Sequence, residues 1–170
     1  MKKIAIILPG DKLPLPSVKG GAVESLVQCL LDYNEKYHTY NFSVFSVYNE
    51  EAALKSRSYK HTDFKYINTD SLNYKLKRVF RWIYNRFFPY IGNQFINSVM
   101  NGMDTDYDYV LIENAPWFVI PLKRKMNMSM VQHLHNNYLG ITSSFNQQII
   151  DNSDLVLAVS KFIKNEILSH

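Results

Sequence analysis

The stretch Lys3–Gly10, KIAIILPG, sets the fold class, because the apolar run Ile4–Leu8 stops abruptly on Pro9 and Gly10. Three later apolar runs also stop on polar residues: Val110–Ile112 before Glu113 and Asn114, Met130–Val131 before the segment with His133, His135 and Asn136, and Leu155–Val159 before Ser160 and Lys161. Continuous apolar runs are typical of parallel strands covered on both faces. The carboxyl ends of such strands meet at one edge of the sheet, where open α/β sheets bind ligands. We therefore expect a ligand site at that edge.

Strand and helix patterns alternate along the chain. The expected strands are Ile4–Leu8, Phe42–Tyr48, Phe64–Ile67, Tyr109–Ile112, Ser129–Leu134 and Leu155–Val159. Apolar residues recur at helical spacing from Val23 to about Tyr37, and a second helix is expected around Ser143–Asp151. This alternation predicts an α/β fold with a doubly wound, Rossmann-like parallel sheet. Residues 1–170 form a single domain in this interpretation, since no linker or repeat divides them.

Composition narrows the class of protein. The chain has 170 residues, of which 46% are hydrophobic and 20% charged, enough for one core. The first apolar run is too short for a signal peptide, and no stretch approaches the roughly 18 apolar residues of a membrane span. A cytoplasmic protein is expected. The single cysteine, Cys29, excludes an internal disulfide framework, and its place near the apolar stripe of its helix predicts a buried, inert thiol.

Several ligand classes are disfavoured by missing motifs. The chain has no G-x-G-x-x-G fingerprint and no G-x-x-x-x-G-K-[ST] loop, so a dehydrogenase or a P-loop enzyme is not expected. A formal net charge of +4 would suit a nucleic-acid partner, but no recognised nucleic-acid motif is present. We expect no nucleic acid among the partners.

Gly20 and Gly21 lie where a long loop meets the first helix. Glycines at a helix start allow close approach of an anion such as a phosphate to free backbone amides. Alternatively the pair only tightens the turn, while Glu24 completes the helix start by accepting backbone hydrogen bonds. The sequence leaves both interpretations open.

His133 and His135 are two residues apart on an expected strand, so their rings point to the same side. A zinc site needs three or four protein ligands, and the sequence shows no obvious third, so no metal is expected. His135, at the strand end, could exchange a hydrogen bond with a hydroxylated substrate. The alternative is that it caps the neighbouring turn at Asn136-Asn137.

The middle of the chain carries a basic amphipathic helix. No Asp or Glu occurs from Ser71 to Met103, whereas this segment contains five basic residues: Lys75, Lys77, Arg78, Arg81 and Arg86. At 100° per residue, one face collects Leu76, Val79, Phe80, Ile83 and Phe87. Such a helix can lie on an anionic membrane, with Lys75, Arg78, Arg81 and Trp82 as candidate contacts. Alternatively the apolar face packs on the sheet and the charges face water.

Five segments in this order resemble the N-terminal domain of the GT-B glycosyltransferases of family four, the retaining sugar transferases that assemble bacterial capsules and lipopolysaccharides. They are KIAIILPG, KGGAVESL, YDYVLIENAP, MVQHLHNNYL and SDLVLAVSKFIKNEI. The resemblance spans nearly the whole chain. It implies one half of a GT-B architecture, with a nucleotide-sugar donor and a glycan or lipid-linked acceptor.

The resemblance also implies roles for individual residues. Gly20 and Gly21 would contact the donor phosphates, and His135 would lie near the reacting sugar as the catalytic residue. The acceptor-side groups would be Glu113, Asn114, His133 and Asn136. Glu113 could instead pair with a lysine or arginine, and Ser160 is expected to be a helix N-cap.

Members of the resembled family bind the donor largely with a second, C-terminal domain. The resemblance therefore implies that this chain is the N-terminal half of a hexosyltransferase that needs no metal or other cofactor, and that it is inactive alone. Two alternatives stay open: a non-catalytic accessory subunit of a transferase, and a sugar-nucleotide epimerase of related shape. Peripheral contact with the inner face of the membrane is a further expectation.

Overall fold

The computed structural model describes residues 1–10, 13–87, 93–140 and 143–168, with the side chains of Arg81 and of residues 84–87 left out. Six strands form one sheet: β1 (Lys3–Ile7), β2 (Asn41–Val47), β3 (Thr62–Ile67), β4 (Tyr109–Glu113), β5 (Ser129–Leu134) and β6 (Leu155–Ala158). All neighbours are parallel, in the order β3-β2-β1-β4-β5-β6. The predicted doubly wound parallel sheet is confirmed, and each strand expected from the sequence is present.

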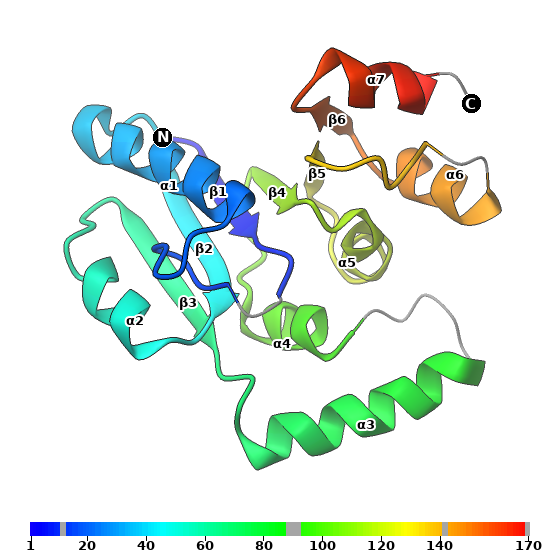
Figure 1. Ribbon diagram of the computed structural model, residues 1–170, viewed down its shortest axis with the longest axis horizontal. Coiled ribbons are helices and arrows are strands. Elements are labelled where there is room, and N and C mark those ends of the chain that lie inside the picture. The colour runs from blue at the N-terminus through cyan, green and yellow to red at the C-terminus, as the bar shows by residue number, and fades with distance from the viewer. Residues whose placement is uncertain (11–12, 88–92, 141–142, 169–170) are drawn as a thin grey trace.

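Helices cover both faces of this sheet (Figure 1). They are α1 (Ala22–Tyr37), α2 (Glu50–Ser56), α3 (Leu72–Phe87), α4 (Gln94–Gly102), α5 (Val119–Lys125), α6 (Ser144–Asp151) and α7 (Lys161–Leu168), with a 3₁₀ turn, η1 (Pro116–Phe118), before α5. The sequence interpretation did not identify α2. Its start has a clear local cause, because the Asn49 side chain accepts a hydrogen bond from the Ala52 amide at 3.1 Å.

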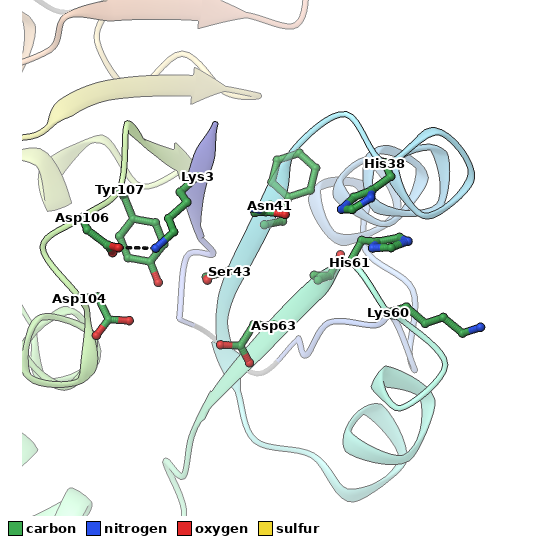
Figure 2. A pocket seen from close by; sticks show the side chains of 12 residues that line it. Lys3, His38, Asn41, Ser43, Lys60, His61, Asp63, Asp104, Asp106 and Tyr107 are labelled. Carbon is green, nitrogen blue, oxygen red and sulfur yellow. Dashed lines mark hydrogen bonds and ion pairs between the residues drawn. The ribbon is translucent and has the colours of Figure 1, made fainter. Parts of the chain in front are cut away.

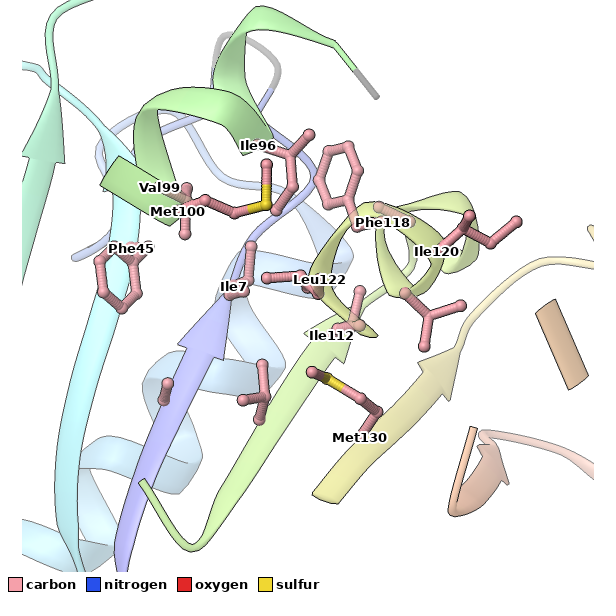
Figure 3. Close-up of a cluster of buried hydrophobic side chains, with 14 of the residues drawn as sticks. Ile7, Phe45, Ile96, Val99, Met100, Ile112, Phe118, Ile120, Leu122 and Met130 are labelled. Atoms are coloured by element: carbon pink, nitrogen blue, oxygen red, sulfur yellow. The ribbon is translucent and has the colours of Figure 1, made fainter. Parts of the chain in front are cut away.

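Two buried clusters hold the layers together. On one face of the sheet, residues of α4, η1 and α5 pack against the central strands, with Ile7, Ile112 and Met130 below Phe118 and Leu122 (Figure 3). On the other face, α1 packs its buried side chains against Ile6 and Val44. Because β1 is buried on both faces, its sequence is a continuous apolar run.

The orientation of α1 corrects one expectation. Cys29 is exposed, not buried. The face that meets the sheet carries Val27, Leu31 and Asn34, and Cys29 lies about 200° around the helix from Val27. Leu26 and Leu30, which also belong to the apolar pattern, are partly exposed. The apolar pattern is therefore wider than the face that the sheet covers.

The buried Asn34 closes the carboxyl end of α1. Its Oδ1 accepts hydrogen bonds from the Thr39 and Tyr40 amides at 3.0 and 2.9 Å, and its Nδ2 donates to the Tyr40 carbonyl at 3.0 Å. These bonds guide the chain from α1 into β2.

We expect Asn34→Ala to destabilise the protein by about 1.5 kcal/mol, because three hydrogen bonds are lost at a buried side chain. Urea unfolding measures this free energy. Asn152→Ala is the matched control, since Asn152 makes one exposed side-chain bond, to the Gln148 carbonyl. Equal losses for the two variants would contradict the role given to Asn34.

Within the described residues, none of the helices combines the length and the apolar character that a bilayer span requires.

Candidate functional site

The sheet order places a crevice between β1 and β4. The chain winds from β1 through β2 to β3 on one side, and from β4 through β5 to β6 on the other. In doubly wound sheets, the connections diverge at this switch point and leave room for a ligand at the carboxyl ends of the strands. Here the segments that follow β1 and β4 border a groove of about 330 Å³, lined by Pro9, Gly21, Glu24, Asn114, Trp117 and Tyr138.

Beside the groove, the strand ends bring Glu113, His133 and His135 together. Glu113, the last residue of β4, lies opposite His133 in the strand register. Its carboxylate is 3.0 Å from His133 Nδ1 and 3.0 Å from His135 Nε2. The two imidazole rings lie side by side with centroids 4.6 Å apart, as their spacing on one strand predicts. Among the described side chains, the partners of Glu113 are these histidines, so the alternative pairing with a lysine or arginine is not what the structure shows.

The charges of this cluster support one another. Burial by itself acts to raise the pKa of Glu113, but the hydrogen bonds and charges of His133 and His135 outweigh it and hold that pKa below its ordinary value. The hydrogen bond and the charge of Glu113 raise the pKa of His133 against the opposing effect of burial. Glu113 is therefore a buried carboxylate whose negative charge is matched by an adjacent imidazole.

Asn114 joins the cluster to the groove. Its amide donates to the His133 carbonyl at 2.8 Å, and its Oδ1 accepts from the His135 amide at 3.1 Å. Its backbone has φ = 49°, in the left-handed region that asparagine tolerates better than most residues. Asn114 thus locks the ends of β4 and β5 to each other, and it also lines the groove.

The same three side chains could hold a metal ion. Each offers one ligand atom, and these atoms lie within 4.8 Å of one another. The sequence interpretation found no third ligand for the histidine pair, and the structure supplies one in Glu113. Two histidines and a carboxylate are a usual ligand set for catalytic zinc. The same atoms also lie within hydrogen-bonding distance of one another, at 3.0 Å from Glu113 to each ring.

The two glycines before α1 differ in their surroundings. Both have positive φ, 78° for Gly20 and 143° for Gly21. A Cβ at Gly21 would overlap the carboxylate of Glu24, whereas a Cβ at Gly20 would meet no described atom within 4 Å. Glu24 is buried and lies in the first turn of α1. Its carboxylate thus lies beside the helix start, and Gly21 lines the groove next to it.

Two aromatic residues of the groove were missed by the sequence interpretation. Trp117 and Tyr138 meet edge to face, with ring centroids 5.3 Å apart and an interplanar angle of 73°. Both remain partly exposed. A tryptophan three residues beyond the polar end of an expected strand is the signal that could have indicated Trp117.

The turn after β5 holds the remaining predicted residue. Asn136 is exposed, its carbonyl accepts from the Tyr138 amide at 2.9 Å, and its Nδ2 lies 3.4 Å from the Tyr138 hydroxyl. Asn137 ties this turn to α7 by donating to the Glu166 carboxylate at 2.9 Å. The turn thus lies next to the aromatic side of the groove. Ser160 is a helix N-cap as expected, because its hydroxyl accepts from the Ile163 amide at 3.2 Å.

A larger depression, of about 650 Å³, lies at the opposite edge of the sheet (Figure 2). Its walls include Lys3, Asn41 and Asp63, which stand at or near the amino ends of their strands. Lys3 is already ion-paired with Asp106, and His38 stacks on His61. We do not place the functional site here, because ligands of doubly wound sheets bind at the carboxyl edge.

The candidate membrane residues lie on α3, which extends away from the sheet (Figure 1) and contributes no described residue to the lining of the groove. Lys75, Arg78 and Trp82 are exposed, and Lys75 lies 3.9 Å from Asp70. The side chain of Arg81 lies outside the described part of the structure. The side chains of the apolar face are exposed as far as they are described, so they do not pack on the sheet.

Fold and edge geometry together define the class: a doubly wound α/β domain with a candidate ligand site at its switch point. No protein-family model matches the chain. The chain is similar to a curated protein of Bacillus subtilis (strain 168) named "Putative glycosyltransferase YtcC". The two are 24% identical over 170 residues, which is 98% of this chain and 35% of the relative. The chain therefore spans about a third of the length of the relative that it matches.

Proposed function

We propose that this chain is the acceptor-side half of a GT-B glycosyltransferase of the retaining, family-four type. In this proposal the complete enzyme moves a hexosyl group from a nucleotide sugar to a glycan or lipid-linked acceptor in cell-surface polysaccharide synthesis, such as capsule or lipopolysaccharide. The observation that carries the proposal is the groove at the switch point, which combines an aromatic wall with hydrogen-bonding groups. The similarity to a protein named as a glycosyltransferase supports the same direction.

The groove suits a sugar. Its volume of about 330 Å³ is near the lower end of the usual range for ligand pockets, roughly 300 to 1,000 Å³. Trp117 and Tyr138 offer ring surfaces against the apolar face of a pyranose, while Asn114 and Glu24 offer polar groups to its hydroxyls. Gly20 and Gly21 would lie beside the donor phosphates, and Asn136 would reach the acceptor from the turn after β5.

His135 would orient the reacting groups. Its Nε2 faces Glu113 at 3.0 Å, which leaves Nδ1 as the ring nitrogen for a substrate hydroxyl. His133 and Glu113 hold that ring in place on the acceptor side. In the proposed transfer, the bond from the anomeric carbon to the leaving phosphate breaks. The acceptor oxygen forms the new bond on the same face, and its proton passes to the leaving phosphate. No protein nucleophile, metal ion or other cofactor takes part.

A second domain would supply most of the donor contacts, so we expect the 170 residues alone to transfer no sugar. A nucleotide-sugar donor is consistent with action in the cytoplasm. The proposal is tested by NMR titration of the chain with UDP, GDP, UDP-glucose and a panel of methyl glycosides. Shifts confined to the groove and the strand ends beside it (Gly20, Gly21, Asn114, Trp117 and His133–Tyr138) would support the proposal. Transfer of sugar by this chain alone would contradict the expectation that a second domain is needed.

Trp117→Ala is expected to weaken binding of the best methyl glycoside by about fivefold, because an aromatic contact of this kind contributes roughly 1 kcal/mol. Affinities come from the same NMR titrations. Trp82→Ala is the matched control, since Trp82 is an exposed tryptophan on α3 that does not line the groove. Equal losses of affinity for the two variants would show that the glycoside does not bind in the groove.

The second candidate function is that of a non-catalytic accessory subunit, which binds a glycan and completes a transferase formed with another chain. The glycan would bind in the same groove. This candidate predicts glycoside shifts at His133–Asn137 with no response of Gly20 and Gly21 to any nucleotide.

A further inference from the structure

We propose that α3 docks on the surface of an anionic lipid bilayer and inserts its apolar face between the headgroups. This inference concerns a surface that does not line the groove, and it does not depend on the proposed function. It rests on the orientation of α3, on the exposure of its large apolar side chains and on its charge.

The orientation of α3 is fixed by one buried residue. Tyr74 is buried, and α3 packs against α4 while its length extends away from the sheet (Figure 1). At 100° per residue, Val79 and Ile83 lie about 140° and 180° from Tyr74 around the helix. The apolar face therefore points away from the protein.

This apolar face is open to solvent. The relative exposures of Leu76, Phe80 and Ile83 are 60%, 71% and 46%, and Leu72 and Val79 are exposed as well. Monomeric proteins seldom leave such a continuous apolar surface uncovered unless it meets a membrane or a partner. The alternative from the sequence, in which this face packs on the sheet, is not what the structure shows.

The positive charge of α3 indicates that the surface that covers its apolar face is anionic. Lys75, Lys77 and Arg78 are exposed on α3, and no Asp or Glu occurs from Ser71 to Met103. An exposed apolar face with basic residues on the opposite, polar side is the pattern of helices that lie in the plane of a bilayer. Trp82, exposed at the flank of the apolar face, is the residue type that prefers the headgroup level.

The position of α3 would also serve a membrane-bound ligand. The helix begins five residues after the carboxyl end of β3, at the sheet edge that also carries the groove. If α3 lies on a bilayer, the carboxyl edge of the sheet, which carries the groove, would therefore lie on the same side of the protein as the membrane.

The test is co-sedimentation with vesicles of phosphatidylglycerol and phosphatidylcholine in equal amounts, compared with pure phosphatidylcholine. We expect binding to the anionic vesicles at low salt, weaker binding at high salt, and a blue shift of Trp82 emission, measured in a Trp117→Phe background. Replacing Lys75, Lys77 and Arg78 by Gln should weaken binding on the order of a hundredfold, since about 1 kcal/mol per basic residue corresponds to about fivefold each.

Matched variants separate this effect from general charge and exposure. Replacing Lys36, Lys60 and Lys164 by Gln also lowers the formal net charge from +4 to +1, but leaves α3 intact. Phe80→Ser should lower binding, whereas Tyr33→Ser, at a tyrosine 61% exposed on α1, should not. The proposal is overturned if the α3 charge variant and the control charge variant bind anionic vesicles equally well. It is also overturned if the wild-type protein does not bind anionic vesicles at all. Self-association that Phe80→Ser abolishes, without vesicle binding, would overturn it in favour of a second copy as the occupant.

Discussion

Replacement of Glu113 by alanine is expected to destabilise the protein by about 3 kcal/mol near pH 6, because removing one partner of a buried ion pair leaves the other uncompensated. The carboxylate is almost fully buried and lies 3.0 Å from nitrogen atoms of His133 and His135. Without it, the strand ends of β4 and β5 lose the charge that holds both rings. Urea unfolding of wild type and variant measures the loss.

The pH dependence of this effect has a definite sign. The pKa of His133 is raised, so its contribution is present below its ordinary value of 6.5 and is lost as the pH rises through the folded pKa. The pKa of Glu113 is lowered, so its contribution is present above the ordinary 4.5 and is lost as the pH falls through the folded pKa. The stability difference between wild type and Glu113→Gln should therefore be largest between about pH 4.5 and 6.5.

Asp63→Ala provides the control for Glu113. Asp63 also pairs with a basic residue, Lys65, at 3.0 Å, but its side chain is 59% exposed, so we expect a loss below about 1 kcal/mol. A pH-independent difference for Glu113→Gln would show that the cluster is not an ion pair. In the complete enzyme, the same substitution should lower the turnover that depends on the orientation of His135.

Gly10→Ala is expected to destabilise the protein by about 2 to 5 kcal/mol, from backbone strain and a steric overlap together. Gly10 follows β1 with φ = 77°, where an L-residue is strained by roughly 1–2 kcal/mol. In addition, its new Cβ would overlap the ring of Phe95, which is buried in the core above the sheet. Displacing a packed core ring adds roughly 1–3 kcal/mol. Thermal or urea unfolding gives the free energy.

Gly20→Ala separates the two causes of that loss. Gly20 has nearly the same φ, 78°, but a Cβ there meets no described atom within 4 Å. Gly20→Ala should therefore lose only the backbone-strain part of the free energy of unfolding, roughly 1–2 kcal/mol. Similar losses at Gly10 and Gly20 would mean that Phe95 yields without cost and that only the backbone conformation matters.

Much of the fold could be predicted because its signals are local. Each buried strand is an apolar run that ends on polar or turn-forming residues, and α1 and α6 follow helical spacing. The short helix α2 was missed because it lacks a sustained apolar period, although Asn49 and the acidic residues after it are a start signal. The site edge was predicted as well, since it follows from where parallel strands end.

The composition of the candidate site was harder to predict. His133 lies on β5 and His135 directly follows its last residue, and their rings lie on the same side as expected. Their partner Glu113 lies on another strand, and Trp117 and Tyr138 approach each other from different segments. Such contacts depend on the order of the strands in the sheet and on their register. The spacing of residues along the sequence does not predict either.

By itself, the sequence determined which segments are strands, that the sheet is parallel and doubly wound, and which polar residues gather at its carboxyl edge, because these follow from periodicity and chain connectivity. Only the tertiary structure decided that Glu113 pairs with two histidines, that Cys29 faces solvent and that the apolar face of α3 points away from the protein. The physical reason is that an amphipathic pattern limits which faces a helix can bury, whereas the choice among them depends on the surface that long-range packing brings against it.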